Sequence, residues 1–182
     1  MTIFTMIRAP GDEAKVRLIG EPTGSLAEIL DELFDNACRA SAHAIHVECV
    51  VDQGRPTLSV YHRGPGIENP MTVLTLVNRR WDDATTRFDD PAGFSLANLA
   101  GRHVMIRSGL DETDIGWNVT ISPDAWRGAA PFTIALEGGL YGTNVLVEIP
   151  EEWRYGLAQA VAAAAANLSV SVFFHARRMN PA

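Results

Sequence analysis

One helix and the hairpin that follows it constrain the fold more than any other part of the sequence. Ser25 and Glu28 have the spacing of a capping box, which predicts a helix that begins at Ser25. Apolar residues then recur at helical spacing and form one stripe, made of Leu26, Ile29, Leu30, Leu33, Phe34 and Ala37. Residues 44–51 and 57–61 alternate in polarity around the turn-forming segment 52–56, which predicts a β-hairpin. We therefore expect the helix to cover an apolar face of the sheet to which this hairpin belongs.

The rest of the chain continues this alternation of helices and strands. Further strands are predicted at residues 15–19, 103–108, 115–122, 132–136, 143–149 and 169–174. Further helices are predicted to begin at Asn69-Pro70, to lie around 95–99 and to cover residues 151–167. Because helices are interleaved with hairpin-connected strands, we expect an α/β (α+β) two-layer sandwich. Its sheet is mixed and largely antiparallel, with the helices packed on one face.

Length and charge limit the class of protein. The 182 residues fit one domain at 15–150, with an N-terminal arm at 1–14 and a C-terminal helix and strand at 151–182. The net charge of −7 carries no nucleic-acid signature, because phosphate backbones favour clustered Lys and Arg. No apolar run approaches the roughly 18 residues of a membrane helix. With no secretory signal and two isolated thiols, Cys38 and Cys49, we expect a cytoplasmic protein.

Two polar residues border the apolar stripe of the first helix. Glu32 and Asn36 stand four residues apart and therefore lie on one helix face. At about 100° per residue, Asn36 falls at the edge of the stripe and Glu32 just beyond it. A carboxylate and an amide at such a border face either solvent or a pocket, and the helix pattern alone leaves both open.

Four segments, in order, resemble the motifs of the GHKL superfamily of ATP-binding domains (gyrase, heat-shock chaperone, histidine kinase, MutL). Residues 32–47 resemble the first motif and come closest to the MutL and chaperone branches. The run His62-Arg63-Gly64-Pro65-Gly66 stands where the family has Asp-x-Gly-x-Gly. Residues 93–99 match the third motif, and residues 142–150 match the last. The resemblance implies the Bergerat-type ATP-binding fold over most of residues 25–150.

The resemblance also implies roles for residues of the first helix and of the segment 62–67, which we call the glycine loop. Glu32 would be the general base that deprotonates the attacking water, and Asn36 would ligate the Mg²⁺ ion that bridges the phosphates of ATP. One protein oxygen suits Mg²⁺, which keeps several phosphate and water ligands. Gly64 and Gly66, which lack a Cβ atom, would let the backbone approach the adenine edge.

The remaining implied roles concern the phosphates, the adenine pocket and a lid. Gly93 and Ser95 would face the phosphates at a helix N-terminus, where N–H groups favour anions. Thr143 would line the adenine pocket. Residues 81–91, an acidic stretch without periodicity, would form a lid over the nucleotide.

The sequence departs from the family pattern at several positions. His62 replaces the aspartate that accepts a hydrogen bond from adenine, which costs about 1.5–3 kcal/mol of binding. Neutral His62 offers one free ring nitrogen as a partial substitute. Residues 67–92 contain no glycine, whereas lids of this family are rich in glycine. In the third motif a family glycine becomes Leu96 in the MutL-like register and Ser95 in the histidine-kinase-like register.

These observations leave three functional hypotheses. The first is an ATP-binding domain with slow, Mg²⁺-dependent hydrolysis at the γ-phosphate, coupled to lid ordering and to association with a second copy or a protein partner. The second is a pseudo-ATPase, an interaction module that has lost nucleotide binding. The third is a stand-alone protein kinase that resembles bacterial anti-sigma factors.

Overall fold

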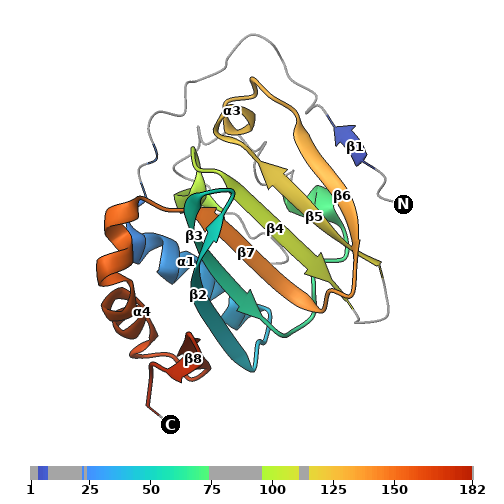
Figure 1. Ribbon diagram of the computed structural model, residues 1–182. Coiled ribbons are helices and arrows are strands. Elements are labelled where there is room, and N and C mark those ends of the chain that lie inside the picture. Colours follow the sequence, from blue (N-terminus) through green and yellow to red (C-terminus); the bar gives the residue numbers. More distant parts are fainter. Residues whose placement is uncertain (1–3, 8–21, 23, 74–95, 111–114, 182) are drawn as a thin grey trace, which may run out of the picture.

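One nine-stranded sheet organises the chain in the computed structural model, which describes residues 4–7, 22, 24–73, 96–110 and 115–181 (Figure 1). The strands are β1 (Phe4–Ile7), β2 (Ala44–Asp52), β3 (Arg55–His62), β4 (Val104–Gly109), β5 (Ile115–Ile121), β6 (Phe132–Gly138), β7 (Gly142–Glu148), β8 (Ser171–Phe174) and β9 (Arg177–Arg178). Their order in the sheet is β1-β6-β5-β4-β7-β3-β2-β8-β9. All neighbouring strands are antiparallel except β2 and β8, which run parallel. The predicted mixed, largely antiparallel sheet is confirmed.

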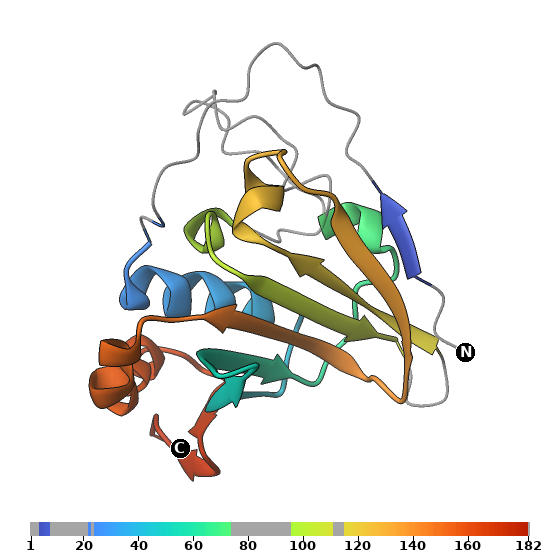
Figure 2. The same cartoon turned by 45° about the horizontal axis from the view of Figure 1, so that its top comes forward.

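Helices form the second layer. The helical elements with described bounds are α1 (Leu26–Arg39), η1 (Ala97–Leu99), α3 (Pro123–Trp126), η2 (Glu151–Gly156) and α4 (Leu157–Ala165), and residues 70–73 are helical as well. In Figure 1, α1 passes behind β2 and β3, and α4 packs beside it. The view turned by 45° shows the same arrangement, with the sheet in front of α1 (Figure 2). Among the described residues, no helix is long and apolar enough to cross a membrane.

The start of α1 follows from its capping box. The Glu28 backbone N–H donates to Ser25 Oγ at 3.3 Å, and the Ser25 backbone N–H donates to Glu28 Oε2 at 2.8 Å. The predicted cap is therefore confirmed, and two orphan donors of the first turn are satisfied. The apolar stripe is buried at Ile29, Leu30, Leu33, Phe34 and Ala37.

Alternation along the strands produces the core beneath α1. Buried side chains of the central strands include Leu58, Val60, Val104, Ile106, Val119, Ile121, Val145 and Val147. Neighbours in the register, such as Val60 and Val145, lie opposite each other and share a face. The predicted hairpin joins β2 to β3, with Gln53 at φ 48° and Gly54 at φ 81° in its turn. Two successive positive φ values fit the right-handed twist of the paired strands.

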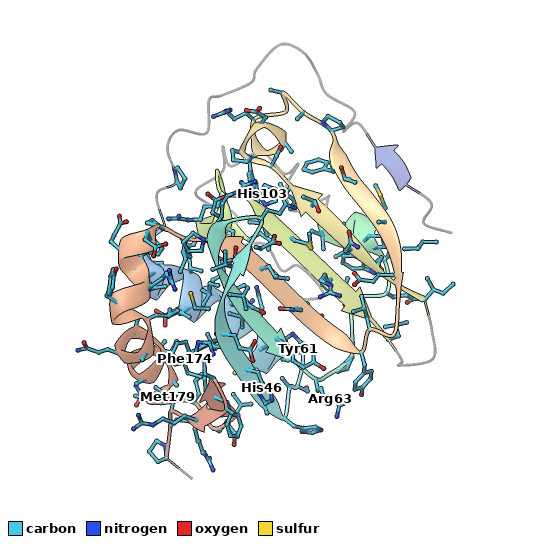
Figure 3. All side chains as sticks on the ribbon, in the orientation of Figure 1. His46, Tyr61, Arg63, His103, Phe174 and Met179 are labelled. Atoms are coloured by element: carbon cyan, nitrogen blue, oxygen red, sulfur yellow. The ribbon has the colours of Figure 1, made fainter. Side chains whose placement is uncertain are left out.

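The opposite face of the sheet carries polar and aromatic side chains. The ring of His46 stacks on that of Phe173, with centroids 5.2 Å apart, and Tyr61 lies on its other side at 6.2 Å. Figure 3 shows His46, Tyr61 and Arg63 at the same end of the sheet. The Arg63 guanidinium lies 5.8 Å from the centroid of the Tyr141 ring.

The C-terminal extension belongs to the same sheet. The helix predicted over 151–167 is a 3₁₀ segment, η2, followed by the α-helix α4 from Leu157 to Ala165. The N-cap of η2, Pro150, makes no side-chain cap, and Gly156, a poor helix former, separates the two pieces. Buried Asn180 then holds β8, because its amide donates to Val170 O at 2.8 Å and accepts from Val172 N at 2.9 Å.

Several smaller elements differ from the sequence expectations. Residues 4–7 of the predicted arm pair with β6 as β1, and α3 and β9 are additional short elements. The predicted helix start at Asn69 is confirmed, since residues 70–73 are helical and Asn69 Oδ1 accepts from Met71 N at 2.9 Å. The strand predicted at 15–19 lies outside the described residues. The short strands β1 and β9 depend on pairing with other strands, which local sequence patterns do not report.

Candidate functional site

Glu32 and Asn36 lie on consecutive turns of α1 and are nearly buried. Their exposed fractions are 9% and 7%, so the alternative of two solvated side chains on the helix surface does not hold. The Glu32 carboxylate accepts a hydrogen bond on Oε2 from the backbone N–H of Asn98 in η1, at 2.7 Å. This bond ties the residues around η1 to α1 and fixes one oxygen of the carboxylate.

A cavity of about 530 Å³ borders this side of α1. Its described lining residues are Glu28, Asp31, Glu32, Phe34, Asp35, Asn36, Arg39, Asn98, Ala164 and Leu168. The volume falls in the range of small-molecule sites. Four carboxylates line it, and the only cation among these residues, Arg39, pairs with Asp35 at 2.6 Å. A polyanionic ligand would therefore need a metal cation beside it.

A row of four side chains crosses the sheet on the face covered by α1. His62 at the end of β3 is opposite Thr143 on β7, which is opposite Ser108 on β4, which is opposite Trp117 on β5. All four are buried, with exposed fractions of 6%, 2%, 0% and 5% in that order. We call these four residues the base row, because the family resemblance implies contacts with the base for His62 and Thr143.

The base row holds the glycine loop through Ile67. The Ile67 N–H donates to Ser108 Oγ at 2.7 Å, and the Ile67 carbonyl accepts from Trp117 Nε1 at 2.8 Å. Ser108 Oγ also donates to Gly142 O at 3.0 Å and lies 3.0 Å from Thr143 Oγ1. Both backbone groups of Ile67 are thus fixed by side chains from two neighbouring strands.

His62 is neutral at physiological pH. Burial lowers the pKa of its imidazole from 6.5 to about 4, because a charged ring would lose its hydration. Its Nδ1 atom is buried and makes no hydrogen bond within the described part of the chain. A neutral imidazole has one donor and one acceptor nitrogen, whereas the family's aspartate has only acceptors. The neutral ring can therefore accept a hydrogen bond from a ligand, but a weaker one than a charged carboxylate would accept.

The two glycines connect the base row with α1. A Cβ atom on Gly64 would lie 3.0 Å from Ala40 O at the end of α1, one turn after Asn36. A Cβ atom on Gly66 would lie 2.3 Å from Gly109 O at the end of β4. The loop is therefore packed between the last turn of α1 and the end of the sheet, and this packing requires glycine at Gly66.

The structure packs the glycine loop against the last turn of α1, the helix that carries Glu32 and Asn36, and pairs His62 with Thr143. Glu32, Asn36, His62, Gly64, Gly66 and Thr143 lie on α1, on the glycine loop and at the adjoining strand ends. Gly93, Ser95 and the lid segment 81–91 lie outside the described residues. The described lining of the cavity includes Glu32 and Asn36 but not the base row.

Sequence reasoning missed Ser108, Trp117 and Asn98. Ser108 had a usable signal, because it continues the buried alternation of Val104 and Ile106 with a polar residue. Asn98 acts through its backbone N–H, so its side chain carries no signal.

The described residues contain no cluster of three or more His, Cys, Asp or Glu side chains that could hold a metal by themselves. The donor chemistry at α1 still suits Mg²⁺ if phosphate and water oxygens complete the shell, because an amide oxygen at Asn36 and nearby carboxylates are hard ligands.

Comparison with known proteins identifies the fold. No protein-family model matches the sequence, and no curated protein sequence matches it. The structure is similar to the Aquifex aeolicus MutL ATPase domain complexed with ADP, with a TM-score of 0.53 and 19% identity over 86% of this chain and 62% of that one. It is similar to the N-terminal domain of a DNA repair protein, with a TM-score of 0.55 and 16% identity over 86% of this chain and 50% of that one.

A third solved structure, a singly substituted Aquifex aeolicus MutL ATPase domain, gives a TM-score of 0.54 and 18% identity over 82% of this chain and 56% of that one. The chain thus spans between half and 62% of these neighbours' lengths. At such low identity the likeness establishes the fold alone: the chain has the α+β fold of these MutL ATPase domains.

Proposed function

We propose that this chain is a GHKL-type ATP-binding domain that hydrolyses ATP slowly in the presence of Mg²⁺. The observation that carries the proposal is the pair Glu32 and Asn36, buried on consecutive turns of α1 beside a cavity of about 530 Å³. A structural neighbour with the same fold is an ATPase domain complexed with ADP, which supports a nucleotide as ligand. The binding domain is proposed to be residues 15–150.

Each residue of the pair has a separate task in this proposal. Glu32 accepts the proton of the attacking water, and the hydrogen bond from Asn98 N–H keeps its carboxylate oriented for that step. Asn36 offers its amide oxygen to Mg²⁺, which when bound neutralises phosphate charge beside the cavity carboxylates. His62 and Thr143 receive the base.

We further propose that bound nucleotide orders the lid, residues 81–91, and favours association with a second copy or a protein partner. Coupling of this kind follows when a ligand binds only one of two states of a segment. The nucleotide would have to bind together with the cation, because the carboxylates that line the cavity would repel phosphate alone.

His62 favours a second candidate function. A buried neutral ring, whose Nδ1 makes no hydrogen bond to any residue that the structure describes, stands where the resemblance implies a charged acceptor for adenine. Losing one charge-assisted hydrogen bond weakens binding by roughly ten- to a hundredfold. In the second candidate the fold serves as a protein-interaction module without nucleotide.

Titration calorimetry with ATP and ADP, with and without Mg²⁺, separates the two candidates. Binding that requires Mg²⁺ is expected for the ATP-binding domain. If neither the wild type nor His62→Asp binds nucleotide at roughly millimolar concentration, the ATP-binding candidate fails.

Hydrolysis is tested with Glu32→Gln, which keeps an oxygen to accept from Asn98 N–H but removes the base. We expect turnover to fall at least about a hundredfold with unchanged ATP affinity. Asp31→Asn is the matched control, because it removes a charge from the same cavity one residue away. Equal turnover in Glu32→Gln and wild type would refute Glu32 as the base.

A further inference from the structure

The hydroxyl of Ser108 uses its whole hydrogen-bonding capacity inside the protein. A hydroxyl has one proton to donate and two lone pairs that accept. The Ile67 N–H can only donate to Ser108 Oγ, at 2.7 Å, and the Gly142 carbonyl can only accept from it, at 3.0 Å. Ser108 therefore has no second proton for Thr143 Oγ1, which lies 3.0 Å away. Thr143 must donate its own proton to Ser108.

This assignment fixes what Thr143 offers to a ligand. Thr143 lies between Ser108 and His62 in the base row, so its proton is directed along the row toward β4. The remaining lone pairs of Thr143 Oγ1 can only accept. A ligand group that contacts this oxygen directly must donate a hydrogen bond to it.

We propose that Ser108 is a specificity-determining residue of the base end: by holding the Thr143 proton, it makes the site prefer a purine with a 6-amino group over one with a 6-oxo group. The inference rests on the proposed nucleotide function and names its substrate class. A 6-amino group donates to Thr143, whereas a 6-oxo group would place acceptor against acceptor. Ser108 acts through Thr143 and Ile67 and is a positioning residue, not a catalytic one.

Trp117 provides a control built into the same row. It fixes the Ile67 carbonyl at 2.8 Å, but no hydrogen bond joins it to Thr143 in the described part of the chain. Loss of its N–H should loosen the glycine loop without releasing the Thr143 proton. Loop fixation and proton direction can therefore be separated by changing one residue or the other.

The experiment measures the dissociation constants of ATP and inosine triphosphate, which carries a 6-oxo group in place of the 6-amino group. We expect the wild type to prefer ATP by about tenfold, the equivalent of one hydrogen bond. Ser108→Ala should bring the ratio close to one, because the Thr143 hydroxyl can then rotate and donate. Trp117→Phe should weaken both nucleotides by the same factor and keep the ratio.

Two more variants keep the test decisive. Thr143→Val removes the same lone pairs and should also bring the ratio close to one, which covers the case in which Ser108→Ala fails to fold. Ser59→Ala removes a hydroxyl from the other face of β3, where it bonds to Asn144 at 3.0 Å, and should change neither affinity nor ratio.

The outcomes separate this inference from the proposed function. ATP binding with the same ratio in wild type, Ser108→Ala and Thr143→Val overturns the role of Ser108 and leaves the ATP site intact. A ratio that falls equally in Trp117→Phe and Ser108→Ala also overturns it, because loop fixation would then explain the preference. Absence of any nucleotide binding by the wild type overturns the proposed function and this inference together.

Discussion

The two halves of the candidate site are built in different ways. Glu32 and Asn36 lie four residues apart on α1 and are placed by helix geometry within a single element. The base row takes one residue from each of four strands that are distant in the sequence. The half that we propose to bind the phosphates is thus local, and the half that we propose to bind the base depends on the register of three strand pairs.

This difference decides how each half responds to change. A substitution at Glu32 removes a chemical group from a helix whose cap and apolar stripe hold it in place independently. A substitution in the base row also disturbs its neighbours, because Ser108 alone connects Ile67, Gly142 and Thr143. We expect substitutions at Glu32 and Asn36, the helix half, to change turnover or ligand binding without changing the stability of the protein. Substitutions in the base row, the strand half, should change both the free energy of unfolding and ligand affinity.

Acid should affect the strand half most strongly. Burial lowers the pKa of His62 from 6.5 to about 4, so between these values the unfolded chain binds a proton that the folded chain does not. Above pH 6.5 the free energy of unfolding therefore contains the full contribution of neutral His62. As the pH falls from 6.5 to about 4, this free energy decreases by about 3 kcal/mol.

Urea unfolding of the wild type and His62→Phe checks this effect. The difference in free energy of unfolding between the two proteins should shift by about 3 kcal/mol between about pH 7 and about pH 4. The shift should disfavour the wild type at low pH, and other titrating groups cancel in the difference. A pH-independent difference would show that His62 is solvated in the folded protein.

His62→Asp should have the next largest effect: it should raise ATP affinity and lower the stability of the free protein. The carboxylate accepts a charge-assisted hydrogen bond, so ATP affinity should rise by about tenfold. The free protein should unfold more easily, because position 62 is only 6% exposed and an unpaired charge there is costly.

Calorimetry and thermal unfolding measure both quantities in the same preparations. His46→Asp is the matched control, since it makes the same change at an exposed position on the other face of the sheet. An equal gain in affinity from His46→Asp would mean that net charge, not the base row, controls binding.

Ser25→Ala should have the smallest effect and test the helix half. It removes the two hydrogen bonds of the Ser25 hydroxyl, one to the Glu28 carboxylate and one from the Glu28 N–H, and should lower the free energy of unfolding by about 1 kcal/mol. ATP affinity should stay unchanged, because Glu32 is held by its own hydrogen bond to Asn98 N–H. Chemical denaturation and calorimetry together check this expectation. A parallel loss of affinity would show that the positions of Glu32 and Asn36 depend on more than the hydrogen bond from Asn98 N–H.

Patterns with a local cause were predictable from the sequence. The cap at Ser25, the stripe of α1, the hairpin turn at Gln53-Gly54 and the start of a helix after Asn69 each depend on residues within about one turn. The pair Glu32 and Asn36 belongs to the same group. The pairing of β1 with β6 was not predictable, because it depends on a partner more than a hundred residues away in the chain.

The sequence by itself determined the secondary structure around α1, the fold class and the residues that the family motifs imply. Only the tertiary structure decided that Glu32 and Asn36 are buried beside a cavity and that Ser108 and Trp117 hold the glycine loop. The physical reason is the distance along the sequence over which each kind of interaction acts. Helix periodicity and capping act over about four residues, whereas the base row exists only after three strand registers align four side chains on one face.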